Sequence, residues 1–197
     1  ASILGGGQSG PVTWKELGGT STHKVIPVIP LSTSAVGKFF LQEIGVSTLG
    51  TCVKGQDNSV QQNEGTNPIF QDTTTAPDIV FPYSVADYIA ESQNGHNPGT
   101  QGSLVMRKVN GIAPTVVNAQ KKKVINTNFP YLHEVYNVVR NAAANPATAQ
   151  VVPTYLTQIF GNGTAGKGWI CSNATARADI ASYGFLPLPK TTCGVVQ

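Results

Sequence analysis

Charged side chains are scarce in this sequence, and their scarcity limits what the protein can bind. Only 12% of the 197 residues are Asp, Glu, Lys or Arg, against about 25% in an average globular protein. The formal net charge is only +3, and no aromatic side chain interrupts the single basic run, Lys121 to Lys123. We therefore interpret this run as a solvated loop and expect no nucleic-acid partner.

Recognisable signals of catalysis and metal binding are also missing. None of the three histidines, His23, His96 and His133, has a second histidine or a cysteine at the spacing of a zinc site. The ten carboxylates show no pairing typical of acid–base catalysis, and the sequence has neither a GxxxxGK[ST] loop nor a GxSxG nucleophile elbow. We expect a non-catalytic protein with no cofactor and no metal. The alternative is a catalytic site assembled from residues far apart in the chain.

Long apolar runs are absent as well. No run approaches the roughly 20 residues that a membrane-spanning helix needs, and no charged-then-apolar signal peptide opens the chain. We therefore expect no membrane span. Residues 1–11 resemble a mature or processed end, so the compartment has to be inferred from the cysteines.

The sequence has three cysteines. Cys171 and Cys193 lie 22 positions apart and bracket a predicted helix, so a disulfide between them would hold the C-terminal tail to the rest of the protein. Cys52 is then either a free thiol or a residue whose partner lies outside this chain. Low charge and this disulfide favour a secreted protein, and the alternative is a cytosolic protein with three reduced thiols.

Residues 24–45 form the most informative stretch. The apolar run 25–29 is rich in β-branched residues and is limited in its pairing by Pro27 and Pro30, which predicts a short buried strand near a sheet edge or a crossover. An apolar stripe at helical spacing follows over residues 36–44, and Gly45 is typical of a helix end. The stretch therefore predicts a strand, a turn and a helix.

The turn between this strand and helix is rich in hydroxyl groups. Any of Ser32, Thr33 and Ser34 can cap the helix. Unpaired backbone N–H groups and the positive end of the helix dipole favour an anion at such a turn. We predict a ligand-binding site made by these three residues and the N–H groups of Ala35 and Val36. The alternative is that the turn caps the helix and binds nothing.

Further elements are predicted in the first half of the chain. Residues 1–22 are rich in Gly, Ser and Thr and predict an irregular segment. Residues 46–77 predict a long loop with at most one short helix. Ser84 opens a second helix with Asp87 as its capping-box partner, and Asn94–Gly95 ends that helix.

The second half of the chain continues this alternation. Residues 104–109 are typical of a strand, whereas residues 129–144 fit either a helix or a strand. A helix is predicted from Pro153 to Gly161, a short strand over residues 169–171, and a last helix from the cap Asn173 to Gly184. Alternating strands and helices indicate an α/β fold with helices packed on a small sheet, and we expect a single compact domain.

Several longer motifs follow one another in a characteristic order. They are VTWKELGG (12–19), VIP with STSAVGKFFLQEIG (25–45), CVKG (52–55), NEGTNP (63–68), FPYSVADYIA (81–90), VNGIAPT (109–115), INTNFPYLHEVYNVVRNA (125–142), YLTQIFG (155–161), GWICSNATARADIASYGFLPLP (168–189) and TCG (192–194). In this ordered set the sequence resembles the phosphate-binding proteins of ABC transporters, specifically the secreted phosphate-binding-like substrate-binding proteins of actinobacteria.

The resemblance implies a periplasmic-binding-protein type II-like fold, in which two α/β lobes close on an oxyanion. It also implies a strand over residues 135–140. Because that family builds its first lobe mainly from an earlier part of the chain, residues 1–197 would form a single α/β domain: the second lobe, with a small mixed sheet flanked by helices, plus the C-terminal helices. A cleft that lacks one wall should bind its ligand weakly.

The family's binding turn is only partly preserved. Ser34 keeps the family's serine, whereas Ala35 stands at the glycine, Val36 at the threonine and Pro30 in the place of an arginine. Each lost charge-assisted hydrogen bond is worth about 1.5 to 3 kcal/mol. Two such losses weaken binding by roughly a hundredfold to ten-thousandfold.

Two functions follow as expectations. The first is a secreted, non-catalytic solute-binding-like protein that binds phosphate or a related oxyanion at residues 32–36, with a partner lobe or an ABC permease as its protein partner. The second is an extracellular structural or interaction domain that has lost the transport site and presents loop 46–77 to a protein or a glycan. A further alternative is that the chain is a fragment of a complete two-lobe protein.

Overall fold

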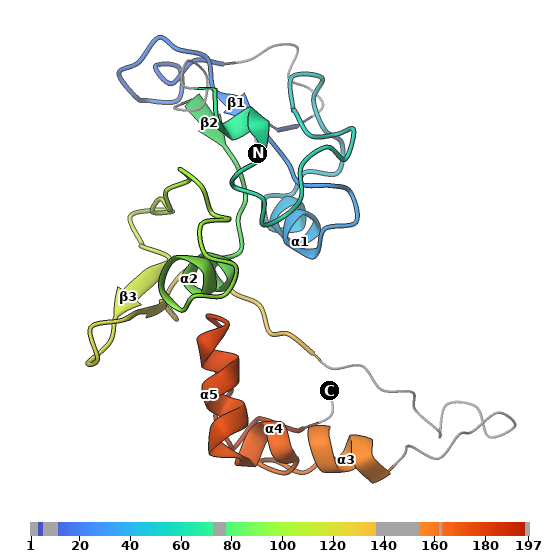
Figure 1. Cartoon of the computed structure of the whole chain (residues 1–197). Helices are drawn as coiled ribbons and strands as arrows, with labels where there is room; N and C mark the ends of the chain where they lie inside the picture. The colour runs from blue at the N-terminus through green and yellow to red at the C-terminus, as the bar shows by residue number, and fades with distance from the viewer. Residues whose placement is uncertain (1–3, 6–11, 73–77, 137–153, 162, 196–197) are drawn as a thin grey trace, which may run out of the picture. The chain divides into compact units, whose positions relative to one another are not determined.

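The computed structural model describes residues 4–5, 12–72, 78–136, 154–161 and 163–195. Over these residues the fold is mixed α/β, with two two-stranded sheets and five α-helices. The chain divides into two compact units, residues 1–131 and 132–197. The elements in chain order are β1 (Ile26–Pro27), α1 (Ala35–Glu43), the 3₁₀ helix η1 (Pro68–Phe70), β2 (Ile79–Val80), α2 (Val85–Gln93), β3 (Thr115–Val117), β4 (Lys123–Ile125), α3 (Thr154–Phe160), α4 (Trp169–Ser172) and α5 (Ala174–Ser182) (Figure 1).

The core of the N-terminal unit is built on both sides of the chain that follows β1. β1 pairs with β2 in parallel, Ile26 opposite Ile79. Val28 lies in a buried cluster with Val60 and Phe70, whereas the next residue, Ile29, lies in a separate cluster with Leu4 and Val53. Successive residues of an extended chain point to opposite faces. The apolar run can therefore fill two small cores at once.

The second helix of this unit is positioned by its caps and by a hairpin. The Ser84 hydroxyl accepts a hydrogen bond from the N–H of Asp87 at the start of α2, and Asn94 ends the helix. β3 and β4 form an antiparallel hairpin. The Gln93 side chain at the end of α2 donates to the carbonyl of Lys123 and accepts from its N–H, and so continues the hairpin's hydrogen bonding onto the helix.

In its described residues the C-terminal unit contains α3, α4 and α5 (orange and red in Figure 1) and a disulfide-bonded tail. The predicted disulfide Cys171–Cys193 is confirmed, and Cys171 is fully buried. The Arg177 side chain of α5 donates to the carbonyls of Cys171 and Leu188, at 3.4 and 2.9 Å. The disulfide and this arginine therefore both hold the tail against the helices.

The predictions based on helix caps are largely confirmed. Ser34, Ser84 and Asn173 cap α1, α2 and α5. Gly45 and Gly184 follow α1 and α5 at φ +67° and +79°, a conformation that costs glycine little. These features depend on residues within four positions of one another, and this is why the sequence alone reveals them.

Two strand predictions are wrong. Residues 104–108 form no strand: the N–H of Leu104 donates locally to the carbonyl of Gln101, and Val105 is 64% exposed. Residues 169–171 belong to helix α4, in which the Ser172 N–H donates to the Gly168 carbonyl. A three-residue apolar run is too short for periodicity to distinguish a strand from a helical turn.

The prediction of a single small sheet is also corrected, because the described strands form two separate pairs, β1–β2 and β3–β4. Of the ambiguous stretch 129–144, the described part, 129–136, contains neither a helix nor a strand. The strand that the resemblance implies over 135–140 is not seen at Val135 and Tyr136, and residues 137–144 lie outside the described residues.

Candidate functional site

The predicted binding turn is held firmly by a neighbouring loop. The N–H of Leu31 donates to the carbonyl of Val60, and the N–H of Ser32 donates to Oδ1 of Asn58, at 2.8 and 2.7 Å. The turn closes on itself where the N–H of Ser34 donates to the carbonyl of Leu31. Loop 58–62 therefore fixes the start of α1 in space, although it lies almost 30 residues further along the chain.

Ser34 is the N-cap of α1 and is only 5% exposed. Its Oγ accepts a hydrogen bond of 3.0 Å from the N–H of Gly37 and donates one of 2.9 Å to Oε1 of Gln62. A serine hydroxyl has a single proton. Because that proton already binds Gln62, a ligand has to displace Gln62 before it can receive a hydrogen bond from Ser34.

Other donors remain open at the helix start. No described group accepts a hydrogen bond from the N–H groups of Thr33, Ala35 or Val36. Ser32, Thr33 and Ala35 are exposed, and Val36 is half-buried. The first N–H groups of a helix need a partner from outside the helix. The predicted residues thus lie together, and they offer three backbone donors beside two exposed hydroxyl groups.

Charges near this turn are few. No acidic residue lies in the first turn of α1. Asp57, next to Asn58 in the chain, has a lowered pKa because the hydroxyl and then the N–H of Ser59 donate to its carboxylate. Asp57 is therefore ionised at neutral pH. Its negative charge opposes anion binding in its surroundings.

Pro30 occupies the position at which the resemblance places an arginine, and it is fully buried. A Cβ on Gly37 would lie 2.9 Å from Cγ of Pro30, so the proline ring packs closely against the first turn of α1. An apolar ring thus fills the space beneath the turn. Any ligand at the turn is held by hydrogen bonds without a charge from this position.

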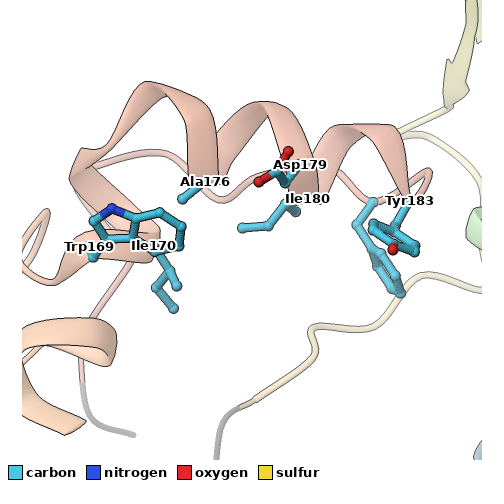
Figure 2. Close-up of a pocket in the computed structure, with 7 residues that line it drawn as sticks. Trp169, Ile170, Ala176, Asp179, Ile180 and Tyr183 are labelled. Carbon is cyan, nitrogen blue, oxygen red and sulfur yellow. The ribbon is translucent and has the colours of Figure 1, made fainter. Parts of the chain in front are cut away.

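A different feature, which the sequence did not predict, lies in the C-terminal unit. It is an open apolar hollow of about 340 Å³ along α4 and α5 (Figure 2). Trp169 and Tyr183 are 47% and 53% exposed. Ala176 and Ile180, which lie four residues apart on α5, contribute to the lining. The apolar spacing of these residues was the signal in the sequence for this hollow. A sequence does not show, however, whether such a helix face is exposed or is covered by other residues of the core.

A third group of polar residues lies around Asp78, which is buried. Its two carboxylate oxygens contact Nε1 of Trp14 at 2.8 Å and Nδ1 of His23 at 3.0 Å. A buried carboxylate beside a histidine is also found in catalytic sites. Here, however, no hydroxyl or thiol of the described residues hydrogen bonds to the His23 ring. The cluster attaches segment 12–25 to the start of β2.

Comparison of the chain with models of protein families, with curated proteins and with solved structures finds no match. The resemblance to phosphate-binding proteins therefore stays a prediction. Over the described ranges, no three His, Cys, Asp or Glu residues come together as metal ligands would. Among the helices of those ranges, none has both the length and the apolar character needed to cross a membrane.

Proposed function

We propose that this protein is a secreted, solute-binding-like protein that binds a small tetrahedral oxyanion at the start of α1. The observation that carries the proposal is the set of open N–H groups at Thr33, Ala35 and Val36, flanked by the exposed hydroxyls of Ser32 and Thr33. Sulfate and phosphate present several acceptor oxygens, and helix N-termini favour negative charge.

The affinity should be low. Ser34 contributes no free proton, Pro30 contributes no charge, and Asp57, the chain neighbour of the Asn58 that binds the turn, is ionised. We expect dissociation constants of about 1 mM, which correspond to a binding free energy of about −4 kcal/mol. The ordered motifs add the finer parts of the proposal: a periplasmic-binding-protein type II-like lobe, phosphate as the ligand, and an ABC permease or a second lobe as the partner.

A backbone substitution tests the site without changing any side-chain charge. Ala35 is the first residue of α1, and proline is accepted at that position of a helix. The preceding residue, Ser34, has φ −59° and ψ 126°, which a following proline tolerates. Ala35→Pro therefore removes one N–H donor while α1 is retained.

The matched control is Val85→Pro. Val85 is the first residue of α2 and follows a serine cap of almost the same conformation, φ −64° and ψ 125°. Sulfate and phosphate are titrated by amide NMR against chloride at equal ionic strength. We expect Ala35→Pro to weaken binding about tenfold, as the loss of one charge-assisted hydrogen bond implies, and Val85→Pro to leave it unchanged. Equal affinities of both variants, or no shift of the amides of residues 33–36 in the wild type, would refute the proposal.

We infer a second candidate function, an extracellular interaction domain, from the hollow along α4 and α5. Exposed Trp169, Tyr183 and Phe185 suit an apolar side chain of a protein partner. In the described part of loop 46–77, residues 46–72, the side chains of Val60 and Phe70 are buried in the core of the N-terminal unit and are not available to a partner. The dye ANS tests the hollow: Trp169→Ala should abolish dye binding and Leu17→Ala, also at an exposed apolar position, should not. Equal dye binding by both variants would exclude the hollow.

A further inference from the structure

The buried carboxyl of Glu91 is the least expected polar group of the N-terminal unit. It lies on α2 and is 5% exposed. Within the described part of the chain, no Lys or Arg forms an ion pair with it. Its polar neighbours are hydroxyl groups: Oη of Tyr83 lies 2.6 Å from Oε2, and the Thr100 hydroxyl, which donates to the carbonyl of Asn97, lies close enough to lower the pKa of the carboxyl. A buried acid without a cation is stable mainly in its neutral form.

The protons at Tyr83 can be counted. Its Oη lies 2.6 Å from Glu91 and 2.9 Å from the carbonyl oxygen of Asn63, and both of these are acceptors when Glu91 is ionised. A tyrosine hydroxyl carries one proton, so it can satisfy only one of the two. Both contacts become hydrogen bonds when Glu91 is protonated: Glu91 then donates to Tyr83, and Tyr83 donates to Asn63.

The acceptor of this relay lies next to a residue of the candidate site. Asn63 follows Gln62, and Oε1 of Gln62 accepts the hydrogen bond from the Ser34 cap of α1. Turn 61–64 is therefore held from two sides, by Tyr83 through its backbone and by Ser34 through a side chain. A change in the protonation of Glu91 can therefore affect the start of α1 through Asn63 and Gln62, two consecutive residues of this turn.

We infer that Glu91 is a proton-controlled positioning residue: when neutral it locks turn 61–64 through Tyr83, and when ionised it releases the turn and with it the Ser34 cap. When Glu91 is ionised, the Tyr83 hydroxyl donates its hydrogen bond to the Glu91 carboxylate, and the Asn63 carbonyl loses its donor. Acidification thus orders the oxyanion site, and neutral pH loosens it. As regulation of that site, the inference rests on the proposed function.

The electrostatic surroundings of Glu91 support the proposal that acidification orders the turn. Burial raises the pKa of Glu91 above its ordinary value of 4.5, and the Asp87 carboxylate adds to the rise, whereas the hydrogen bond from Tyr83 and the nearby Thr100 hydroxyl oppose it. The folded protein therefore binds more protons than the unfolded chain above pH 4.5. Stability from this group is complete below that pH and is lost as the pH rises through the raised pKa.

Titratable groups on the neighbouring segments have to be distinguished from Glu91. They are Tyr83 and Asp87, Glu64 in the turn that carries Asn63, and His96 in the turn that precedes Thr100. Burial raises the pKa of Tyr83 so far that it stays protonated over the range of the experiment. Glu91→Gln isolates the carboxyl, because its amide can donate to Tyr83 as the protonated acid does, at every pH.

The chain offers a matched control. Glu134 accepts a hydrogen bond of 2.7 Å from the Tyr136 hydroxyl, and both residues are exposed. Glu134→Gln therefore makes the same change in charge and chemistry at another tyrosine–glutamate pair. The wild type, both variants and Tyr83→Phe are melted at pH 4.0 and 7.5, the carboxyl carbons are titrated by NMR, and sulfate, which does not titrate in this range, is the ligand probe.

We expect Glu91→Gln to melt at a higher temperature than the wild type at pH 7.5 and at the same temperature at pH 4.0, with no such pattern for Glu134→Gln. The amides of Gln62 and Ser34 should titrate with the Glu91 carboxyl in the wild type and lose that titration in Glu91→Gln and Tyr83→Phe. Between pH 4.0 and pH 7.5 the sulfate affinity of the wild type should fall about fivefold more than that of Glu91→Gln. This factor is at the low end of the coupling typically found between two sites of a protein.

Three results would overturn the inference. They are a titration midpoint of Glu91 that is not above its ordinary value of 4.5, amides of Gln62 and Ser34 that do not titrate with Glu91, and sulfate affinities with the same pH dependence in the wild type and Glu91→Gln. The proposed function fails separately. If sulfate binds none of the proteins while the amides of Gln62 and Ser34 follow Glu91, the oxyanion site is wrong and the proton-controlled turn is right.

Discussion

Replacing Ser34 tests whether its hydroxyl serves the fold or the ligand. In Ser34→Ala the N–H of Gly37 loses its acceptor and Oε1 of Gln62 loses its donor. Loss of a serine N-cap costs about 1 kcal/mol, and an unpaired, partly buried acceptor costs about 1 kcal/mol more. The N-terminal unit should therefore lose about 2 kcal/mol, which lowers the urea midpoint by about 1 M for a slope near 2 kcal/mol/M.

The assay is urea unfolding followed by far-UV circular dichroism, together with the sulfate titration. Ser32→Ala is the control, because Ser32 is an exposed serine only two residues before Ser34. The free energy of unfolding of this variant should change by less than about 0.5 kcal/mol. For Ser34→Ala, sulfate affinity at pH 4.0 should fall by no more than about fivefold, as it does when ionised Glu91 releases the Ser34 cap, because the hydroxyl proton already belongs to Gln62 and is not given to the ligand.

Ser34→Asp should give the opposite result. The carboxylate still caps the helix, and Gln62 can turn its amide to donate to it, so stability should stay near that of the wild type. Sulfate binding should disappear because of charge repulsion. Our reasoning would be refuted if Ser34→Ala kept the stability of the wild type and lost sulfate binding, because the hydroxyl would then serve the ligand.

Two further predictions concern the fold. Exchange of both Cys171 and Cys193 for serine opens a bridge with a sequence separation of 22 and should destabilise the C-terminal unit by about 3 kcal/mol, seen as a lower melting temperature that reductant no longer changes. Gly55→Ala should cost more than about 3 kcal/mol in urea unfolding, since its φ is +81° and a Cβ would lie 2.1 Å from the carbonyl oxygen of Ile29. Gly45→Ala, at φ +67° in open space, should cost only about 1 kcal/mol; equal costs would mean that the close approach at Gly55 relaxes freely.

The sequence by itself determined the helices whose caps are local. Ser34, Ser84 and Asn173 accept hydrogen bonds from N–H groups three residues further along their own helices, so their side chains and the apolar stripes behind them were enough to predict α1, α2 and α5. The disulfide was predictable for a similar reason, because two cysteines on either side of one helix leave few other pairings.

Only the tertiary structure decided what these elements do. Gln62 takes the proton of Ser34 from 28 residues away, Pro30 fills the space beneath α1, and Tyr83 joins Glu91 to Asn63. The exposed hollow beside Trp169 depends in the same way on what covers a helix face. The spacing of residues in the sequence predicts hydrogen bonds between near neighbours. Which distant acceptor a hydroxyl binds, and whether an acid is buried, depends on the path of the chain between distant residues.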